Sequence, residues 1–436
     1  MSTIDLVPDG FKKSDVGVIP KTWDIKPFGE CFNIIAGLGF GKSEYTQSGL
    51  NLLRIDNVSY GKVIWDSIAY LPENYVNKYP HLILQAGDLL LALNRPITNG
   101  KLKLAKLAPH DLPSILYQRV GKISTSDKNI DLNFAFFLLT KFIKLFVEES
   151  AVGTDQPFIS TTKLKKCVLP IPPKEEQTAI ANALSDVDAL LTELENLITK
   201  KQAIKTATMQ QLLTGKTRLP QFATYTEGAD EGKRKGTKSS ELGKIPEDWD
   251  VEKIGSVVSI TTGSRNTQDK LSSGKYPFFV RSQTIERIDT YSFDGEAVLT
   301  AGDGVGTGKI FHYINGKFDY HQRVYLMHNF GDRIDGYYFY IYFSNFFYDR
   351  IMSMTAKSSV DSVRREMIAD MLITLPPKEE QVATATILSD MDNEIQTLEQ
   401  RLTKTRQIKQ GMMQQLLSGR TRLPFKKLET KQDGGS

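Results

Sequence analysis

Two glycine-rich stretches are the part of the sequence that most resembles a nucleotide-binding loop. Residues 302–309 place Asp303 where a phosphate-binding loop needs its first glycine, and Ile310 follows where a magnesium-binding Ser or Thr is needed. Residues 37–42 depart from the same pattern, and neither stretch has the third glycine of a dinucleotide fingerprint. We therefore expect flexible loops whose backbone can approach a ligand closely.

Other patterns that would indicate catalysis or metal binding are also missing from the sequence. The two cysteines, Cys31 and Cys167, have no zinc spacing and form no disulfide framework, and the five histidines show no paired ligand spacing. A nuclease-like pattern, Pro-Asp followed by Asp-x-Lys, can be traced through residues 8–26, but its repeat partner at residues 250–252 has lost the lysine. The sequence thus predicts a protein without catalytic residues or a metal site.

Polar clusters in the expected loops suit contact with nucleic acid. Arg and Lys recognise guanine, Asn and Gln recognise adenine, and phosphates take Lys, Arg, Ser and Thr. The 204-residue spacing of Gln118-Arg119 and Gln322-Arg323 leaves a structural role equally open for these two pairs, and for the other residues a solvated loop is the alternative. The candidate DNA-binding residues are Asn94, Arg95, Lys101, Gln118, Arg119, Thr154, Gln156, Ser160, Thr161, Lys163, Arg265, Asn266, Arg281, Gln283, Lys309, Arg323, Lys357, Ser358, Arg364 and Arg365.

The charge of the chain is too small for a generally basic surface. The 436 residues carry a formal net charge of +4. Counted from the sequence, residues 11–172 hold 20 basic and 14 acidic side chains, whereas residues 241–372 hold 15 and 18. Contact with DNA must therefore come from local patches. Because there is no signal pattern and no apolar run near ~18 residues, we expect a cytoplasmic protein.

A duplicated segment supplies the elements that position these loops. Residues 173–220 recur as residues 377–424 at a constant offset of 204, with 27 of 48 positions identical. Each copy opens with Pro-Pro-Lys-Glu-Glu-Gln and ends near Gly215 or Gly419, with a proline five residues later. Proline and acidic residues favour a helix start, and glycine favours its end. Each copy therefore predicts one helix of about 40 residues, roughly 60 Å long.

Both predicted helices carry a narrow apolar seam. Alternating steps of four and three residues are typical of a coiled coil, and two seams in one chain most economically bury each other. We expect an intramolecular coiled coil that acts as a spacer; the alternative is two unrelated amphipathic helices, each docked on its own domain. The seam residues are Ile180, Leu184, Val187, Leu191, Leu194, Ile198, Leu388, Met391, Ile395, Leu398 and Leu402.

A globular block precedes each helix. An Ile-Pro-x-x-Trp motif opens the blocks at residues 19–23 and 245–249, an offset of 226, so the second block is shorter by 22 residues. Both blocks read as mixed α and β with strands dominant, and Gly302-Asp303 is assigned to the place of Gly87-Asp88. The expected strands are residues 51–55, 82–84, 89–91, 276–280 and 297–299, and the expected helices are residues 134–146 and 337–348.

The order of these parts indicates circular symmetry. Residues 227–240 are polar, without apolar periodicity, and read as a solvated linker between the first helix and the second Trp motif. After the second helix the only counterpart of this linker and motif is residues 1–24. We therefore predict that the N-terminal segment folds back beside the C-terminal tail.

Two similar but distinct domains on a rigid spacer suit a linear ligand with two separate half-sites. One turn of B-DNA is about 34 Å, so a rod of about 60 Å that crosses at an angle can place two domains on one face of the duplex. Because the blocks differ, the half-sites should differ, which predicts an asymmetric bipartite DNA sequence.

The sequence resembles the specificity subunit of a type I restriction–modification system. The resemblance rests on Ile-Pro-x-x-Trp before each block, on the Gly-Asp pairs at residues 87–88 and 302–303, on Pro-Pro-Lys-Glu-Glu-Gln, and on Gln-Gln-Leu-Leu-x-Gly-(Lys/Arg)-Thr-Arg-Leu at residues 210–219 and 414–423. It covers nearly the whole chain, twice and in order. The acidic second block is a departure that makes its DNA face harder to place.

The resemblance implies an α+β protein in which two target recognition domains are separated by two long helices in an antiparallel intramolecular coiled coil, with circular pseudo-twofold symmetry. The expected divisions are residues 1–24 (N-terminal segment), 25–171 (first recognition domain), 172–215 (spacer helix), 216–244 (linker), 245–375 (second recognition domain), 376–419 (spacer helix) and 420–436 (C-terminal tail).

The resemblance also implies the partners. They are double-stranded DNA, two modification methyltransferase subunits docked on the helices, and translocating endonuclease subunits in the full complex. The chain itself would bind no cofactor, because S-adenosylmethionine, ATP and magnesium would serve the partner subunits. Two rival functions are weighed: a self-sufficient modification enzyme, which lacks the necessary motifs, and a coiled-coil scaffold that links protein partners without selecting DNA.

Overall fold

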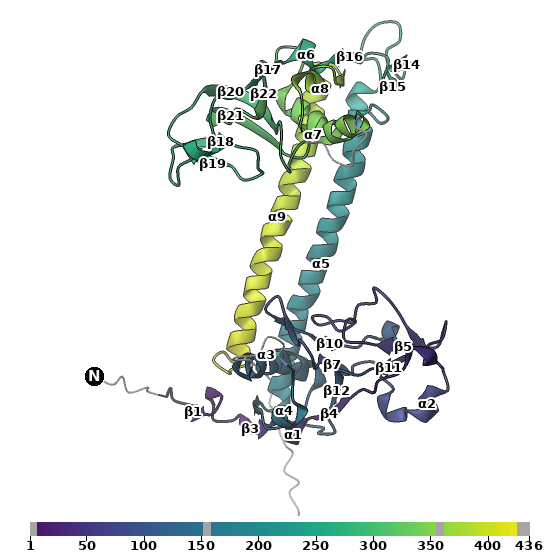
Figure 1. The fold of residues 1–436 in the computed structure, drawn as a ribbon, viewed down its shortest axis with the longest axis vertical. Helices are drawn as coiled ribbons and strands as arrows, with labels where there is room; N and C mark the ends of the chain where they lie inside the picture. Colours follow the sequence, from purple (N-terminus) through teal and green to yellow (C-terminus); the bar gives the residue numbers. More distant parts are fainter. Residues whose placement is uncertain (1–6, 151–157, 355–361, 425–436) are drawn as a thin grey trace, which may run out of the picture. The chain divides into compact units, whose positions relative to one another are not determined.

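The computed structural model describes residues 7–150, 158–354 and 362–424 (Figure 1). The chain divides into two units, one made of Met1–Leu194 and Arg401–Ser436 and the other of Glu195–Gln400. Each unit thus holds one globular block and parts of both long helices. No helix in the described ranges is long and apolar enough to cross a membrane.

The first unit is built from short strands that form several small sheets. Its main sheet has the order β10-β7-β12-β4, and a smaller one has the order β11-β5-β6. The elements are β1 (Phe11–Ser14), β2 (Gly17–Pro20), β3 (Asp24–Pro27), α1 (Phe28–Cys31), β4 (Asn33–Ala36), β5 (Leu50–Leu53), β6 (Tyr70–Leu71), α2 (Tyr75–Lys78), β7 (Leu89–Ala92), β8 (Ile97–Thr98), β9 (Lys101–Leu102), β10 (Leu104–Lys106), β11 (Ser114–Leu116), β12 (Val120–Ser124), α3 (Leu132–Ser150), α4 (Thr161–Leu164) and β13 (Val168–Ile171).

The second unit joins the corresponding strands into one sheet. Its order is β17-β22-β20-β21-β18-β19. The elements are β14 (Thr237–Ser240), β15 (Gly243–Pro246), β16 (Asp250–Lys253), α6 (Ile254–Val257), β17 (Ser259–Thr262), β18 (Tyr276–Phe279), β19 (Glu286–Ile288), β20 (Phe293–Ala301), β21 (Phe311–Tyr320), β22 (Val324–His328), α7 (Gly336–Ser353), α8 (Arg365–Ala369) and β23 (Leu372–Leu375).

The two blocks share one architecture, residue by residue. The offset of 226 relates β1–β5 to β14–β18, and the offset of 204 relates β12–β13 to β22–β23. Leu53 pairs with Leu116 where Phe279 pairs with Tyr320, so the 22 extra residues of the first block lie between these two points. There the single long strand β21 is replaced by β10 and β11 with an intervening loop.

Aromatic side chains hold α3 and α7 on their units, as the sequence predicts. In α7, the rings of Phe343 and Phe347 lie 5.5 and 6.3 Å from the ring of Phe311 on β21. Phe134, Leu138 and their apolar neighbours on α3 are buried in the core of the first unit. The expected helices at residues 134–146 and 337–348 are confirmed and extend a few residues further at both ends.

The long helices form as predicted, as α5 (Lys174–Leu213) and α9 (Lys378–Leu416). Both end beside a glycine with positive φ, at +68° for Gly215 and +67° for Gly419, where a side chain would be strained. All predicted seam residues are buried or half-buried.

Ion pairs show that the helices run antiparallel. Within the second unit Lys201 pairs with Glu394 at 2.7 Å, and Lys205 pairs with Asp392. A later residue on α5 therefore pairs with an earlier residue on α9. The second pair recurs at the 204 offset in the first unit, where Lys409 pairs with Asp188. An antiparallel intramolecular coiled coil is therefore present in each unit.

The Gln that recurs at the start of each long helix attaches the helix to its block. Gln177 Nε2 donates to the carbonyls of Asn129 and Pro172, while its Oε1 accepts from the Asp131 amide. Gln381 makes the same three bonds at the 204 offset. Each Gln side chain therefore satisfies otherwise unpaired backbone groups where the strand leads into the helix.

A Trp–Glu–Arg cluster with a buried carboxylate closes each unit. In the first unit Trp23 Nε1 donates to Glu176 at 3.0 Å. Arg422 donates two hydrogen bonds to the same carboxylate, at 2.9 and 2.7 Å. Arg422 and Glu176 come from the two separate chain segments that form this unit. A Cβ on Gly419 would lie 2.4 Å from Pro20, so only glycine fits there.

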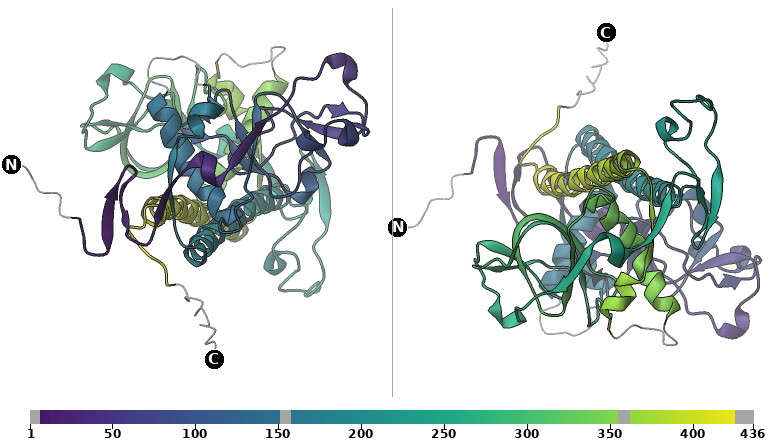
Figure 2. Two further views of the ribbon diagram at one scale, coloured as in Figure 1. Left: turned by 90° about the horizontal axis from the view of Figure 1, so that it is seen from below. Right: turned by 90° about the horizontal axis from the view of Figure 1, so that it is seen from above.

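The predicted return of the N-terminal segment to the C-terminal region is therefore confirmed for the described residues. Figure 2 shows the purple N-terminal hairpin beside the yellow chain that leaves α9. Ile19 and Trp23 share a core with Leu416 and Leu417.

Three sequence predictions about local structure are wrong. Residues 82–84 do not form a strand; Pro80 instead begins a 3₁₀ turn over Pro80–Leu82. The predicted linker contains β14, which pairs with β15 around Gly243. Short polar strands such as β14 carry no apolar alternation, so the pattern gave no signal.

The third error concerns the Gly-Asp pairs. Gly87-Asp88 precede β7, whereas Gly302-Asp303 follow β20. Because Ala92 and Ala301 occupy equivalent places opposite Val120 and Val324, the counterpart of Gly302-Asp303 is Leu93-Asn94. The dipeptides look alike but lie at opposite ends of equivalent strands.

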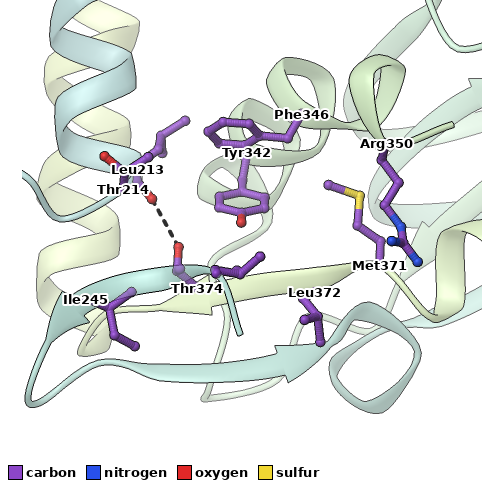
Figure 3. Close-up of a pocket in the computed structure, with 10 residues that line it drawn as sticks. Leu213, Thr214, Ile245, Tyr342, Phe346, Arg350, Met371, Leu372 and Thr374 are labelled. Atoms are coloured by element: carbon purple, nitrogen blue, oxygen red, sulfur yellow. Dashed lines mark hydrogen bonds between the residues drawn. The ribbon is translucent and has the colours of Figure 1, made fainter. Parts of the chain in front are cut away.

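A mainly apolar cavity of about 280 Å³ lies in the second unit between α7, β23 and the end of α5 (Figure 3). Thr374 donates to the carbonyl of Leu213 across one side of it at 3.0 Å. The first unit has Pro170 at the equivalent position, which cannot make this bond. This hydrogen bond is thus a difference between two otherwise matching junctions.

Candidate nucleic-acid interface

The polar loops of each block gather at one end of its sheet. In the first unit the Leu93 amide donates to the carbonyl of Arg119, and the Leu93 carbonyl accepts from the Ile159 amide. In the second unit Gly302 makes the equivalent bonds with Arg323 and Val363. The loop after β7 or β20, the turn before β12 or β22, and the segment after α3 or α7 therefore meet in both units.

A close-approach glycine brings a further loop to the same end. A Cβ on Gly37 would lie 2.3 Å from the Tyr117 carbonyl oxygen, and one on Gly263 would lie 2.1 Å from that of Tyr320. These glycines let the loops after β4 and β17 pack against the protein's own backbone. The expectation that residues 37–42 keep glycine for a ligand is therefore corrected for Gly37.

In the first unit this end carries exposed Arg and amide side chains. Asn94 and Arg95 follow β7, and Arg95 and Arg119 both have positive φ, at +46° and +67°. Gln118 is exposed beside Arg119. Lys101 lies on the β8–β9 hairpin with its Nζ 5.6 Å from the Tyr60 ring.

Gln118 has a partial structural role. Its amide Nε2 donates to the Tyr117 hydroxyl at 3.3 Å, and its backbone amide donates to the Leu38 carbonyl. Gln322 likewise donates to the side chain of Asn266 at 2.7 Å. Both glutamines thus hydrogen-bond to the loop that follows β4 or β17, while their side chains stay exposed.

In the second unit Asp303 brings two predicted arginines together. Arg281 Nη1 donates to Asp303 Oδ1 at 2.8 Å, and Arg323 Nε lies 3.8 Å from Oδ2. Arg281 follows β18 and Arg323 precedes β22, so elements distant in sequence converge on one carboxylate. The guanidinium groups remain accessible, with the side chains 42% and 66% exposed.

A neutral histidine supports this arrangement. Burial lowers the pKa of His321, and the nearby Arg281 lowers it further. Its Nδ1 accepts a hydrogen bond from the Arg323 backbone amide at 2.9 Å, which requires that nitrogen to be unprotonated. His321 therefore holds the turn that presents Arg323.

Arg265 is attached to the domain interior. Its Nε donates to Asp319, which is fully buried and also accepts from Thr290 and Ser292. Because a buried carboxylate needs such partners, this side chain contributes to folding as well as to the polar end of the sheet.

Several other predicted residues have local roles or lie outside the described residues. Ser160 caps α4 by accepting from the Lys163 amide, so Ser160, Thr161 and Lys163 lie at one helix start. Lys309 Nζ lies 4.9 Å from the Tyr348 ring. Gln283, Arg364 and Arg365 are exposed. Thr154, Gln156, Lys357 and Ser358 lie outside the described residues.

Comparison with known proteins identifies this arrangement. The family model described as type I restriction modification DNA specificity domain matches residues 20–206 and 246–409, which is most of the chain. The chain belongs to this family. The two matched regions coincide with the two blocks and most of the helix that follows each, so we call the blocks the first and second recognition domains.

Individual relatives agree with the family. The chain is 42% identical over 210 residues to the type I restriction enzyme MjaVIII specificity subunit of Methanocaldococcus jannaschii, a match that covers 48% of this chain and 49% of the relative. The match therefore spans about half the length of that protein.

Solved structures agree in fold across nearly the whole chain. The type I restriction–modification S subunit from M. genitalium covers 90% of this chain and 96% of its own, with a TM-score of 0.56 and 15% identity. A chain from the structure described as "Structural basis underlying complex assembly and conformational transition of the type I R-M system" covers 92% and 99%, with a TM-score of 0.53 and 17% identity. At these identities the likeness concerns the fold.

Sequence reasoning missed Asp303 and Val305 as parts of the polar end of the second recognition domain. An acidic residue does not fit a pattern for binding phosphates, and a lone valine reads as core. The available signal was the run of glycines around them, which indicates an irregular loop. No group of His, Cys, Asp and Glu in the described part of the chain could hold a metal ion.

Proposed function

We propose that this chain is the DNA sequence-specificity subunit of a type I restriction–modification complex. Each recognition domain would read one half of an asymmetric bipartite target, and the coiled coil would set the gap. The observation that carries the proposal is the repeated gathering of exposed Arg, Lys and amide side chains at the equivalent end of both sheets.

Differences between the two ends support an asymmetric target. The first domain presents Arg95 and Arg119 on backbone with positive φ, whereas the second presents Arg281 and Arg323 around Asp303. The two domains share their arrangement of strands and loops, but they differ in the side chains that would face the bases. Two unlike half-sites are expected from such a pair.

We further propose that this chain carries no catalytic activity of its own. Two modification methyltransferase subunits would dock on the long helices, and endonuclease subunits would join the full complex. S-adenosylmethionine, ATP and magnesium would then serve those partners, in the cytoplasm, where chromosomal DNA lies. The scaffold alternative is set aside, because the matching family is a DNA specificity domain.

Methylation mapping tests the proposal. Genomic DNA from cells with the methyltransferase partner should be mapped with and without this chain. A two-part motif with a fixed gap is expected only when the chain is present. Identical maps from cells in which the complex assembles would overturn the specificity role.

A further inference from the structure

A fully exposed valine stands out in the second recognition domain. Val305 is 105% exposed relative to a reference residue, more than any other large apolar side chain in the described residues. It lies in residues 302–309, here named the glycine loop, which connects β20 to the residues before β21. Exposed apolar side chains are common singly, but one that projects completely from a constrained loop calls for a physical reason.

Hydrogen bonds and close packing hold the glycine loop in place. Thr307 is 4% exposed, and its hydroxyl and amide both bond to the Gly304 carbonyl, at 2.6 and 3.1 Å. The Lys309 amide bonds to the Gly306 carbonyl at 3.0 Å. A Cβ on Gly306 would lie 1.9 Å from Ile310, so the backbone there touches its support directly. Val305 is thus presented on an anchored turn.

The loop starts within the polar end of the domain. Asp303, two residues before Val305, binds Arg281 and lies near Arg323. The Arg281 carbonyl oxygen lies 3.7 Å from the Cβ position of Gly306. An apolar tip is therefore placed beside the side chains expected to approach the bases.

DNA offers one apolar group that such a tip could recognise. In the major groove the C5-methyl of thymine is the apolar feature that distinguishes A·T from G·C pairs, and apolar side chains read it by contact. The second domain has 15 basic and 18 acidic residues over residues 241–372. It therefore has less net positive charge than the first domain to attract phosphates, which favours specific contacts with base edges.

The first domain lacks this feature at the corresponding place. After β7 the chain forms the β8–β9 hairpin, whose turn consists of Asn99 and Gly100. Its tip is polar. An apolar loop tip after this strand therefore belongs to the second domain, whereas the first domain exposes Phe158, which is 64% exposed and bridges to Asn94.

We propose that Val305 is a specificity-determining residue that contacts the methyl group of a thymine in the half-site read by the second domain. The inference rests on the proposed function. It requires at least one A·T pair in that half-site, and a second half-site made only of G·C pairs would overturn it.

Replacement of thymine by deoxyuridine tests the contact, because this change removes only the methyl group. The complex of the full chain with its methyltransferase partner would be titrated with duplexes that carry deoxyuridine at one thymine at a time. For the wild type, one position in the second half-site should weaken binding about three- to fivefold, the effect of one buried methyl-sized group.

The variant Val305→Ala supplies the decisive comparison. It should bind the unmodified duplex about as weakly as the wild type binds the deoxyuridine duplex, and it should be insensitive to deoxyuridine at that position. Leu271→Ala, which alters another exposed side chain of the domain that is 45% exposed, is the control and should keep the wild-type pattern.

The outcomes separate the two levels of the proposal. A wild-type complex that binds unrelated duplexes as tightly as its target would contradict the proposed function. A complex that is selective for its target but is unaffected by deoxyuridine at every position, or that shows the same deoxyuridine effects in Val305→Ala, would overturn the thymine contact alone. An increase in 2-aminopurine fluorescence that depends on Val305 would also overturn it, because it would indicate insertion between bases.

Discussion

Arg281 is the exposed cation whose geometry best suits base recognition in the second domain. Asp303 accepts one of its N–H groups at 2.8 Å and leaves the rest of the guanidinium accessible. A carboxylate that orients one edge of an arginine leaves the other edge for a guanine, which takes two parallel hydrogen bonds.

Arg281→Ala should weaken discrimination in one half-site by about 1–3 kcal/mol. The measurement is the affinity of the assembled complex for duplexes that differ at single positions. The loss should be confined to substitutions in the second half-site. An equal loss for all sequences would instead identify a phosphate contact.

Asp303→Asn should have a different signature. Removal of a negative charge beside DNA should raise affinity for unrelated duplexes, while the loss of an oriented partner for Arg281 should reduce discrimination. Asp294→Asn is the matched control, since Asp294 is an exposed carboxylate 4.0 Å from Lys317 on the same domain. Unchanged discrimination in Asp303→Asn would show that Arg281 needs no orienting partner.

The closing clusters differ between the units, although their element pairs match. Arg218 is 8% exposed and binds both Glu380 and Asp248, whereas Arg422 is 37% exposed and binds Glu176. The position equivalent to Asp248 is Thr22. The second cluster is therefore the more enclosed one.

Arg218→Ala should destabilise the second unit by about 3–5 kcal/mol, because it leaves the buried Glu380 carboxylate without its cation. Arg422→Ala should have a smaller effect on the first unit, because water can replace a half-exposed guanidinium. Hydrogen exchange of β15 and β16, compared with β2 and β3, measures the two effects separately. Equal losses of protection would contradict this ranking.

Asp248 should make the second unit sensitive to acid. Burial raises its pKa, but hydrogen bonds from Lys235 and Arg218 outweigh this and lower it below the ordinary value. A lowered folded-state pKa stabilises above the unfolded value, about 3.9, and is lost as pH falls through the folded one.

Asp248→Asn should therefore unfold the second unit more easily at pH 7, and the difference from wild type should shrink below about pH 4. Denaturation by urea at both pH values measures it. A difference that stays constant with pH would show that the carboxylate charge is not what stabilises the cluster.

At the scale of the whole molecule, each recognition domain is closed by a strand pair at its boundary. Asp24 pairs with Ile171, and Asp250 pairs with Leu375. The chain enters and leaves each domain through neighbouring strands, so a domain can be exchanged without cutting a sheet.

Exchange of residues 24–171 for those of a relative should change only one half of the methylated motif. The gap and the other half should stay the same, because the helices and the second domain are untouched. Sequencing of methylated genomic DNA measures the result, and exchange of residues 250–375 is the complementary control. A change in both halves would show that the domains do not read independently.

Much of the fold could be predicted from the sequence because the sequence contains an internal repeat. The repeat, the glycines at the helix ends and the apolar seam predicted α5, α9 and the return of the N-terminal segment. The β14 strand could not be predicted, because its polar side chains show no clear period, although its partner β15 follows directly in the sequence. The strand expected at residues 82–84 is wrong, because Pro80 begins a 3₁₀ turn there.

The amino-acid sequence alone establishes that two similar domains alternate with two long helices, and which residue types are available to contact DNA. Which of these residues meet depends on the folded sheet. Asp303 joins Arg281 to Arg323 because the residues that follow β18, follow β20 and precede β22 converge, and strand order is set by hydrogen bonds between residues far apart in the chain. Local patterns carry no record of such pairings, so the neighbours of an exposed side chain follow from the folded sheet.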